Sequence, residues 1–148
     1  MHIVLYKPDI PQNTAAIIRL GACLKLEIHI VEPCGFNLND RRFKRVVMDY
    51  MDLTKIIRHE DFRTFLSKYE KNRIVLMTTK AKKLYHNFKF KKNDMLLFGR
   101  ESAGVPENLH KTIKNKLKIP MNKKTRSLNV GMSVAIIASE ALRQNNLL

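Results

Sequence analysis

Six polar side chains lie at or shortly after the ends of short apolar runs, and they are the residues best placed for chemistry: Asn13, Arg19, Glu101, Arg126, Ser127 and Asn129. Arg19 is predicted to lie about one and a half turns into a helix, close to the carboxyl end of the first strand. A guanidinium with a pKa above about 12 is a poor base, so Arg19 would orient a hydroxyl and stabilise it as it loses its proton. A surface ion pair is the alternative role for Arg19.

The motifs of several common catalytic sites are absent from the sequence. Neither GxGxxG nor GxxxxGK[ST] occurs, and the stretch GRESAG (99–104) is followed by Val105 and Pro106 where a P-loop requires Lys and then Ser or Thr. The five histidines are scattered without a GxSxG motif, so we interpret each as a surface or packing residue. The acidic residues form no metal-ligand cluster and the two cysteines form no CxxC, so we expect no metal.

Short apolar runs alternate with helical patterns along the chain. Runs rich in Ile, Val and Leu indicate buried strands over 3–6, 28–31, 73–79, 94–99 and 116–121. Helical periodicity appears over 14–25, with Asn13 or Thr14 as the N-cap, and over 59–70. This alternation predicts a single α/β domain over residues 1–148, with a mostly parallel sheet flanked by helices. Such sheets bind ligands outside the carboxyl ends of their strands.

The formal net charge of +15 is concentrated in one part of the chain. Residues 71–126 contain 16 Lys and Arg against three acidic residues, whereas the flanking segments carry little net charge. Concentrated positive charge attracts a polyanion, because neutralised phosphates release counterions, so we expect a nucleic-acid partner. The alternative is that these lysines only keep the surface hydrated and bind no nucleic acid. No apolar stretch approaches the roughly 18 residues that span a bilayer, so we expect no membrane contact and a cytoplasmic location.

Residues 80–92 combine six lysines with three aromatic residues, Tyr85, Phe88 and Phe90. Aromatic rings among cations can stack on nucleic-acid bases, or they can pin a surface loop to the core. We favour the second interpretation.

Three segments of the sequence together resemble one known family. They are IVLYKPDIPQNTAAIIR (3–19), LLFGRESAGVP (96–106) and IPMNKKTRSLNVGMSVAIIASEALRQ (119–144). The resemblance is to the SPOUT superfamily of S-adenosylmethionine-dependent RNA methyltransferases, and within it to the small single-domain enzymes that methylate the ribose 2′-hydroxyl of the tRNA wobble nucleotide. It implies a SPOUT fold, in which the C-terminal half of an α/β sheet is threaded into a deep trefoil knot that holds the methyl donor.

The same resemblance implies a role for individual residues. The donor pocket would be formed by Met77, Gly99, Ile119 and Ser127, largely through backbone groups. At Gly99, the missing Cβ would let the ligand come close or let the turn take positive φ, with a purely structural turn glycine as the alternative.

The tRNA, through its anticodon stem-loop, would be bound by Lys123, Lys124 and Arg126. Arg19 would be the catalytic residue, delivered beside the pocket of the other subunit of a homodimer. Asn13 and Glu101 would support the active-site loops. The last helix is apolar around most of its circumference, which favours burial against both its own core and a partner; burial wholly within the monomer is the competing interpretation.

The sequence departs from the family pattern at four positions: Ala15, Ala16, Gly131 and Met132. Ala16 and Met132 replace asparagines, so their side chains make no hydrogen bonds.

Taken as a whole, the resemblance predicts 2′-O-methylation of nucleotide 34, a cytidine or the uridine of leucine tRNA. Ribosomal RNA as the substrate, and an RNA-binding module without catalysis, remain the alternatives.

Overall fold

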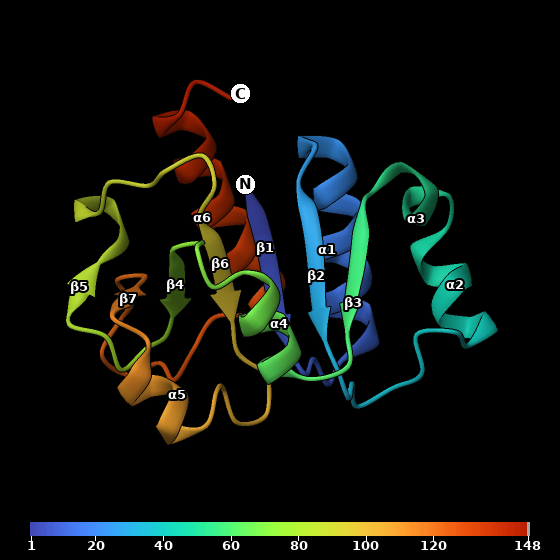
Figure 1. The fold of residues 1–148 in the computed structure, drawn as a ribbon, viewed down its shortest axis with the longest axis horizontal. Helices are drawn as coiled ribbons and strands as arrows, with labels where there is room; N and C mark the ends of the chain where they lie inside the picture. Colours follow the sequence, from blue (N-terminus) through green and yellow to red (C-terminus); the bar gives the residue numbers. More distant parts are fainter. Residues whose placement is uncertain (148) are drawn as a thin grey trace.

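The computed structural model describes residues 1–147 as a seven-stranded sheet with helices on both faces (Figure 1). The strands are β1 (His2–Tyr6), β2 (Glu27–Val31), β3 (Ile56–His59), β4 (Ile74–Met77), β5 (Lys83–Leu84), β6 (Met95–Phe98) and β7 (Asn115–Lys118). The helices are α1 (Pro11–Leu24), α2 (Arg41–Val47), α3 (Tyr50–Leu53), α4 (Phe62–Lys68), α5 (Glu107–Thr112) and α6 (Val130–Gln144), with a 3₁₀ turn η1 (Tyr85–Asn87). Every strand pair is parallel, in the order β3-β2-β1-β6-β4-β7-β5.

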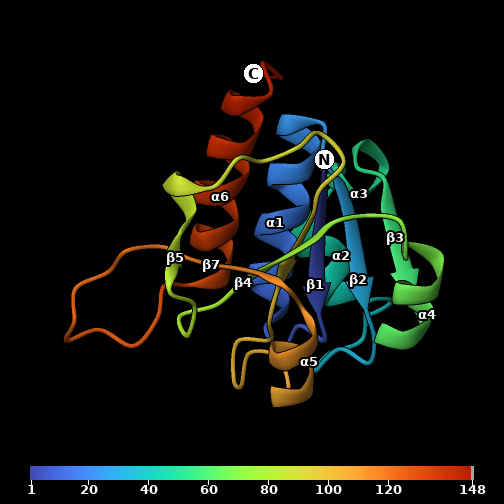
Figure 2. The same cartoon turned by 60° about the vertical axis from the view of Figure 1, so that its left-hand side comes forward.

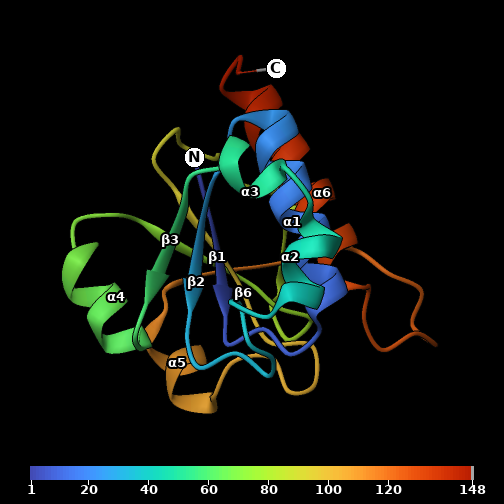
Figure 3. The ribbon, with the colours of Figure 1, turned by 90° about the vertical axis from the view of Figure 1, so that its right-hand side faces the viewer.

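Two separate layers of apolar side chains cover the two faces of the sheet. Along β1, Ile3 and Leu5 pack under α1, α2 and α6, whereas Val4 and Tyr6 pack under α4 and α5. Figure 3, which views the sheet nearly edge-on, shows these two groups of helices on opposite sides. Because successive side chains of a strand point to opposite faces, a strand buried on both faces must be apolar throughout. The prediction of an α/β fold with a parallel sheet covered by helices is confirmed.

The five predicted strands are all present. Their exact ends, and the order in which they lie in the sheet, could not be predicted from the sequence. The edge strands β3 and β5 were not predicted, because β3 contains Arg58 and His59 and β5 has only two residues. The strand β7 ends at Lys118, so Ile119 belongs to the loop that follows it. None of the helices within residues 1–147 combines the length and the apolar character needed to span a membrane.

The first helix begins earlier than its periodicity indicated. Pro11 occupies the first turn, the N-cap is Ile10, and no side chain caps the helix, so the prediction of Asn13 or Thr14 as the cap is wrong. Proline suits this place because its fixed φ matches the helix and its missing N–H is not needed there. As a result Arg19 lies about 2.2 turns, or ~12 Å, into α1, further along the helix than the one and a half turns that were predicted.

The aromatic residues of the lysine-rich segment 80–92 hold that segment to the core. Phe88 and Phe90 are buried, and Tyr85 packs against the same core. Gln144, at the end of α6, donates to the Phe88 carbonyl over 3.0 Å and accepts from the Phe90 N–H over 2.9 Å. The predicted pinning of the loop is thus confirmed for these rings.

Two of the five histidines serve packing, as the sequence indicated. His29 and His59 are buried, stacked on each other, and lie edge-on to Phe65 and Tyr69 of the α4 layer. Burial lowers the pKa of His29 to about 3, so this imidazole is neutral at neutral pH.

Candidate active site

A cavity of about 520 Å³ opens at the carboxyl ends of β4, β6 and β7. Its walls come from the loops after these strands and from the beginnings of α1 and α6. Figure 2 shows the backbone of these segments. Met77, Gly99, Ile119 and Ser127 all line it. The tertiary structure therefore brings together the four residues predicted to hold the methyl donor, while their role as its ligands stays a prediction.

The inner wall of the cavity is apolar, with a few polar groups around it. Leu76, Phe98 and Val105 are buried at its inner end. Thr78 Oγ1 lies 3.2 Å from His110 Nε2, and both residues line the cavity. Burial is the main reason that the pKa of His110 lies below its usual value, which favours a neutral ring in this hydrogen bond.

The turn from Gly99 to Gly104 is closed by the protein's own backbone. The Gly104 N–H donates to the Arg100 carbonyl over 2.8 Å, and the Arg100 N–H donates back to the Gly104 carbonyl over 3.2 Å. A Cβ added to Gly99 would lie 2.6 Å from Gly104 Cα, and the positive φ of the turn, +67°, is at Gly104. The geometry supports the structural interpretation of Gly99, because the close neighbour is backbone and its own φ is not positive.

Asp9, in the loop after β1, is held by the loop after β6. Its carboxylate accepts hydrogen bonds from the guanidinium of Arg100, including Nη2, and from the Ser102 N–H over 3.0 Å. Hydrogen bonds from Arg100, followed by those from Ser102, hold the pKa of Asp9 well below its usual range. The first loop is thereby fixed against the GRESAG turn through an ionised carboxylate.

A second chain of hydrogen bonds joins three segments that are distant in sequence. Glu101 accepts from the Asp9 N–H over 2.8 Å and from Asn13 Nδ2 over 3.1 Å. Asn129 Nδ2 donates to Asn13 Oδ1 over 2.9 Å, while Asn129 Oδ1 caps α6 by accepting from the N–H groups of Gly131 and Met132. Asn13 and Glu101 thus join these loops through hydrogen bonds, in agreement with the supporting role that the family resemblance implied for them.

Three of the predicted functional side chains lie outside this cavity. Arg19 is exposed on α1, with its guanidinium 5.0 Å from the centre of the Tyr50 ring. Lys123 and Lys124 are exposed in segment 119–129, the orange loop that projects from the molecule in Figure 2. Arg126, from the same segment, lines the cavity.

A second hollow, of about 550 Å³, lies at the β5–β7 edge of the sheet and is strongly basic. It is lined by Lys80, Lys82, Lys83, Phe88, Lys114, Asn115, Lys116 and Leu117. Lys80 pairs with Glu107 over 3.3 Å, and Lys116 donates to the His110 carbonyl over 2.7 Å. We call this the lysine hollow.

A model of the SpoU rRNA methylase family matches residues 1–139. The chain belongs to the SpoU rRNA methylase family. Within this family, the tRNA (cytidine(34)-2′-O)-methyltransferase of Beijerinckia indica is 46% identical over 144 residues, which cover 96% of this chain and 90% of the relative.

Solved structures of other proteins share the fold. One, from a study of 2′-OH methylation of C/U34 on tRNA, matches with a TM-score of 0.93 and 36% identity, over 98% of this chain and 95% of that chain. The SpoU methyltransferase AviRb of Streptomyces viridochromogenes, solved with AdoMet, matches with a TM-score of 0.87 at 21% identity, over 99% of this chain and 58% of that chain. The SPOUT resemblance is confirmed.

Several residues of the site could not be found from the sequence. Asp9, Arg100 and Ser102 form the densest polar contacts beside the cavity, and His110 lines it. Asp9 and Arg100 are 91 residues apart and belong to no local spacing pattern. Their one signal is that each follows a predicted buried strand, where ligand sites of parallel sheets form.

Proposed function

We propose that this chain is an S-adenosylmethionine-dependent methyltransferase that modifies the ribose 2′-hydroxyl of tRNA nucleotide 34, a cytidine or the uridine of leucine tRNA. The carrying observation is the cavity at the carboxyl ends of β4, β6 and β7, lined by Met77, Gly99, Ile119 and Ser127. Relatives that match nearly the whole chain are named for this reaction. A tRNA substrate also implies a cytoplasmic enzyme.

The cavity suits the proposed donor in size and character. Its volume of about 520 Å³ lies within the range of roughly 300–1,000 Å³ typical of small-molecule sites. Met77 and Ile119 offer apolar surface and backbone groups, as a purine requires, and Ser127 adds a hydroxyl. Bound S-adenosylmethionine would supply an activated methyl group.

The protein itself would align the methyl donor with the ribose hydroxyl and assist the loss of the hydroxyl proton. Arg19 would orient the ribose oxygen and stabilise it as its proton leaves. Because Arg19 lies outside the cavity of its own chain, we propose that each site is completed by Arg19 of the partner subunit.

A homodimer is supported by exposed apolar side chains near the starts of α1 and α6. Ile10 is 42% exposed, Leu128 39% and Met132 64%. The two helix starts are joined by the Asn13–Asn129 hydrogen bond, so these side chains belong to one region. A single chain leaves this region uncovered, which favours a partner copy.

Two cationic regions would bind tRNA. Lys123 and Lys124 lie on the projecting segment 119–129, and Arg126 lies at the cavity edge. The lysine hollow adds a second cationic surface at the β5–β7 edge of the sheet. Both would contact phosphates and set register on the RNA, while the cavity selects the ribose.

We further propose that residues 1–148 form one domain whose C-terminal part is threaded into a trefoil knot. The support is the family membership and the sheet order, in which β4 lies between β6 and β7. Limited proteolysis should leave the whole chain as one resistant unit. Refolding of a chain circularised before denaturation should differ from that of the linear chain, because a closed chain keeps its topology.

The test of function uses labelled S-adenosylmethionine and unmodified tRNA. Label should reach the 2′-oxygen of nucleotide 34, as mapped by mass spectrometry of anticodon-loop fragments. Ribosomal RNA is the second candidate substrate, favoured by the description of the family model. Label in ribosomal fragments alone would establish that alternative. Absence of donor binding in calorimetry would indicate an RNA-binding module without catalysis.

A further inference from the structure

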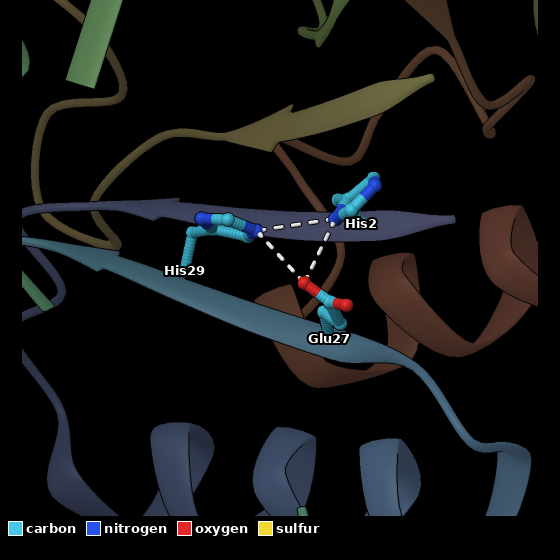
Figure 4. Close-up of side chains that lie close together, drawn as sticks. All are labelled: His2, Glu27 and His29. Atoms are coloured by element: carbon cyan, nitrogen blue, oxygen red, sulfur yellow. Dashed lines mark hydrogen bonds and ion pairs between the residues drawn. The ribbon is translucent and has the colours of Figure 1, made fainter. Parts of the chain in front are cut away.

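Three side chains at the amino ends of β1 and β2 form a compact cluster away from the cavity. His2 and Glu27 are register partners on adjacent strands, and His29 follows two residues after Glu27 on the same face. Figure 4 shows His2, Glu27 and His29 pointing toward one another. The side-chain period of two in β-strands places all three on the face that packs under α4.

The ligand-type atoms of this cluster are spaced as a tetrahedral metal site requires. His2 Nδ1 lies 3.2 Å from His29 Nε2 and 3.4 Å from Glu27 Oε2. His29 Nε2 lies 3.9 Å from Glu27 Oε2. A zinc ion with tetrahedral bonds of about 2.0–2.2 Å needs ligand atoms roughly 3.3–3.6 Å apart. Small side-chain adjustments would therefore bring all three atoms into one coordination shell.

Neighbouring groups orient two of these side chains from behind. His29 Nδ1 lies 3.0 Å from His59 Nε2, so a proton on Nδ1 would leave Nε2 with a free lone pair facing the cluster. Lys55 Nζ donates to Glu27 Oε1 over 2.8 Å, which leaves Oε2 facing the histidines. Metal-binding histidines and carboxylates typically have such outer partners, which fix their tautomer and direction.

Solvent can reach the cluster from one side. The side chain of His29 has no exposed surface, while those of His2 and Glu27 are 19% and 31% exposed. An ion would thus bind at the boundary of the core, with a water molecule as its fourth ligand.

We propose that His2, Glu27 and His29 form a binding site for a divalent transition-metal ion of the zinc class. Two imidazole nitrogens and one carboxylate oxygen are the donor set that zinc accepts, whereas magnesium and calcium prefer oxygen ligands alone. The site joins the amino ends of β1 and β2, and it therefore lies at the opposite end of the strands from the cavity. Its role is to clamp these two strands, and it takes no part in methyl transfer.

The test measures zinc binding to the full chain without a histidine tag. Calorimetry should give one zinc ion per chain, and zinc at 100 times its Kd should raise the Tm by about 5–10 °C. The variants His2→Ala and Glu27→Gln each remove one ligand at a partly exposed position. Each should weaken zinc affinity by at least about tenfold and abolish most of the Tm shift, with methyl transfer unchanged.

The matched control is His86→Ala, which removes an exposed histidine on η1 and should leave zinc affinity unchanged. Two outcomes would overturn the proposal. One is a wild-type chain whose Tm does not respond to zinc, which would leave only a hydrogen-bonded histidine row. The other is unaltered zinc affinity in both ligand variants, which would place the ion elsewhere. Neither outcome bears on the proposed methyl transfer, because its assay needs no added zinc.

Discussion

Asn13 Nδ2 donates to Glu101 Oε1 over 3.1 Å, and this contact joins the first turn of α1 to the loop after β6. Glu101 also accepts from the Asp9 N–H, and Asn13 also accepts from Asn129. One carboxylate therefore links the loops on both sides of the cavity to the start of α6. The shape of the cavity depends on side chains that do not have to touch the donor.

The variant Glu101→Ala should weaken donor binding. It leaves the Asp9 N–H and the Asn13 amide without their acceptor, and an unsatisfied, partly buried donor costs about 1–2 kcal/mol. The expected loss in S-adenosylmethionine affinity is about 5- to 30-fold, measured by calorimetry. Glu70→Ala, the same change at an exposed position after α4, should leave affinity unchanged. Equal affinities in the two variants would contradict the linking role of Glu101.

Asp9→Asn should destabilise the fold in a pH-dependent way. The pKa of Asp9 is lowered in the folded protein, chiefly by Arg100, so its stabilisation is complete above the unfolded pKa of about 4 and is lost as pH falls below it. The free energy of unfolding in urea should differ by about 1–2 kcal/mol between wild type and variant at pH 7. The difference should shrink steadily below pH 4. A gap that stays constant down to pH 2 would show that the charge of Asp9 is not responsible.

Arg19→Ala should lower kcat by at least about a hundredfold while donor affinity stays within twofold, because assistance to proton loss typically contributes 10²–10⁴ in rate. A mixture of the Arg19→Ala and Gly99→Val proteins shows whether Arg19 acts in the cavity of its own chain or in that of the partner. In Gly99→Val the added side chain meets the Gly104 backbone. If Arg19 acts in the partner's cavity, mixed dimers regain one working site and activity returns. If Arg19 acts within its own chain, no mixture is active.

Charge reversal in the lysine hollow should weaken tRNA binding. The double variant Lys82→Glu/Lys83→Glu should lower tRNA affinity by about tenfold or more at 150 mM salt. The slope of log affinity against log salt should become shallower by roughly two, one for each lost phosphate contact. Lys68→Glu is the control, because Lys68 lies on α4, which contacts β3 at the opposite edge of the sheet, and this change should have a small effect on both quantities. An unchanged salt slope in the double variant would remove the hollow from the RNA surface.

Met132→Glu should shift the protein from dimer to monomer. Met132 is 64% exposed in the single chain, and a charge buried at an interface costs several kcal/mol unless it is paired. Sedimentation velocity should show the shift at micromolar concentration, with loss of methyl transfer at the same concentrations. Leu66→Glu on α4 is the matched control, because Leu66 is also exposed but lies on the other face of the sheet. A dimer that persists in Met132→Glu would exclude this region as the interface.

Local patterns in the sequence indicated which segments form buried strands. Residues 95–98, within the predicted strand 94–99, are apolar at every position, as a strand covered on both faces requires, and the fully buried β6 follows from that. Three ordered segments carried the family resemblance, and the lysine-rich composition of 71–126 indicated where a polyanion would bind. These properties reside in residue type and short-range spacing, so they can be read without knowing the fold.

The pairs of distant residues that meet were found from the three-dimensional fold and not from the sequence. The contact of Asp9 with Arg100, and the cluster of His2, Glu27 and His29, depend on which strands pair and in which register. The two histidines looked scattered in sequence because parallel strands are joined by long crossovers, which bring residues 27 positions apart side by side. The placement of Arg19 outside its own cavity likewise depends on where α1 starts, a boundary set by Pro11 and not by the apolar period.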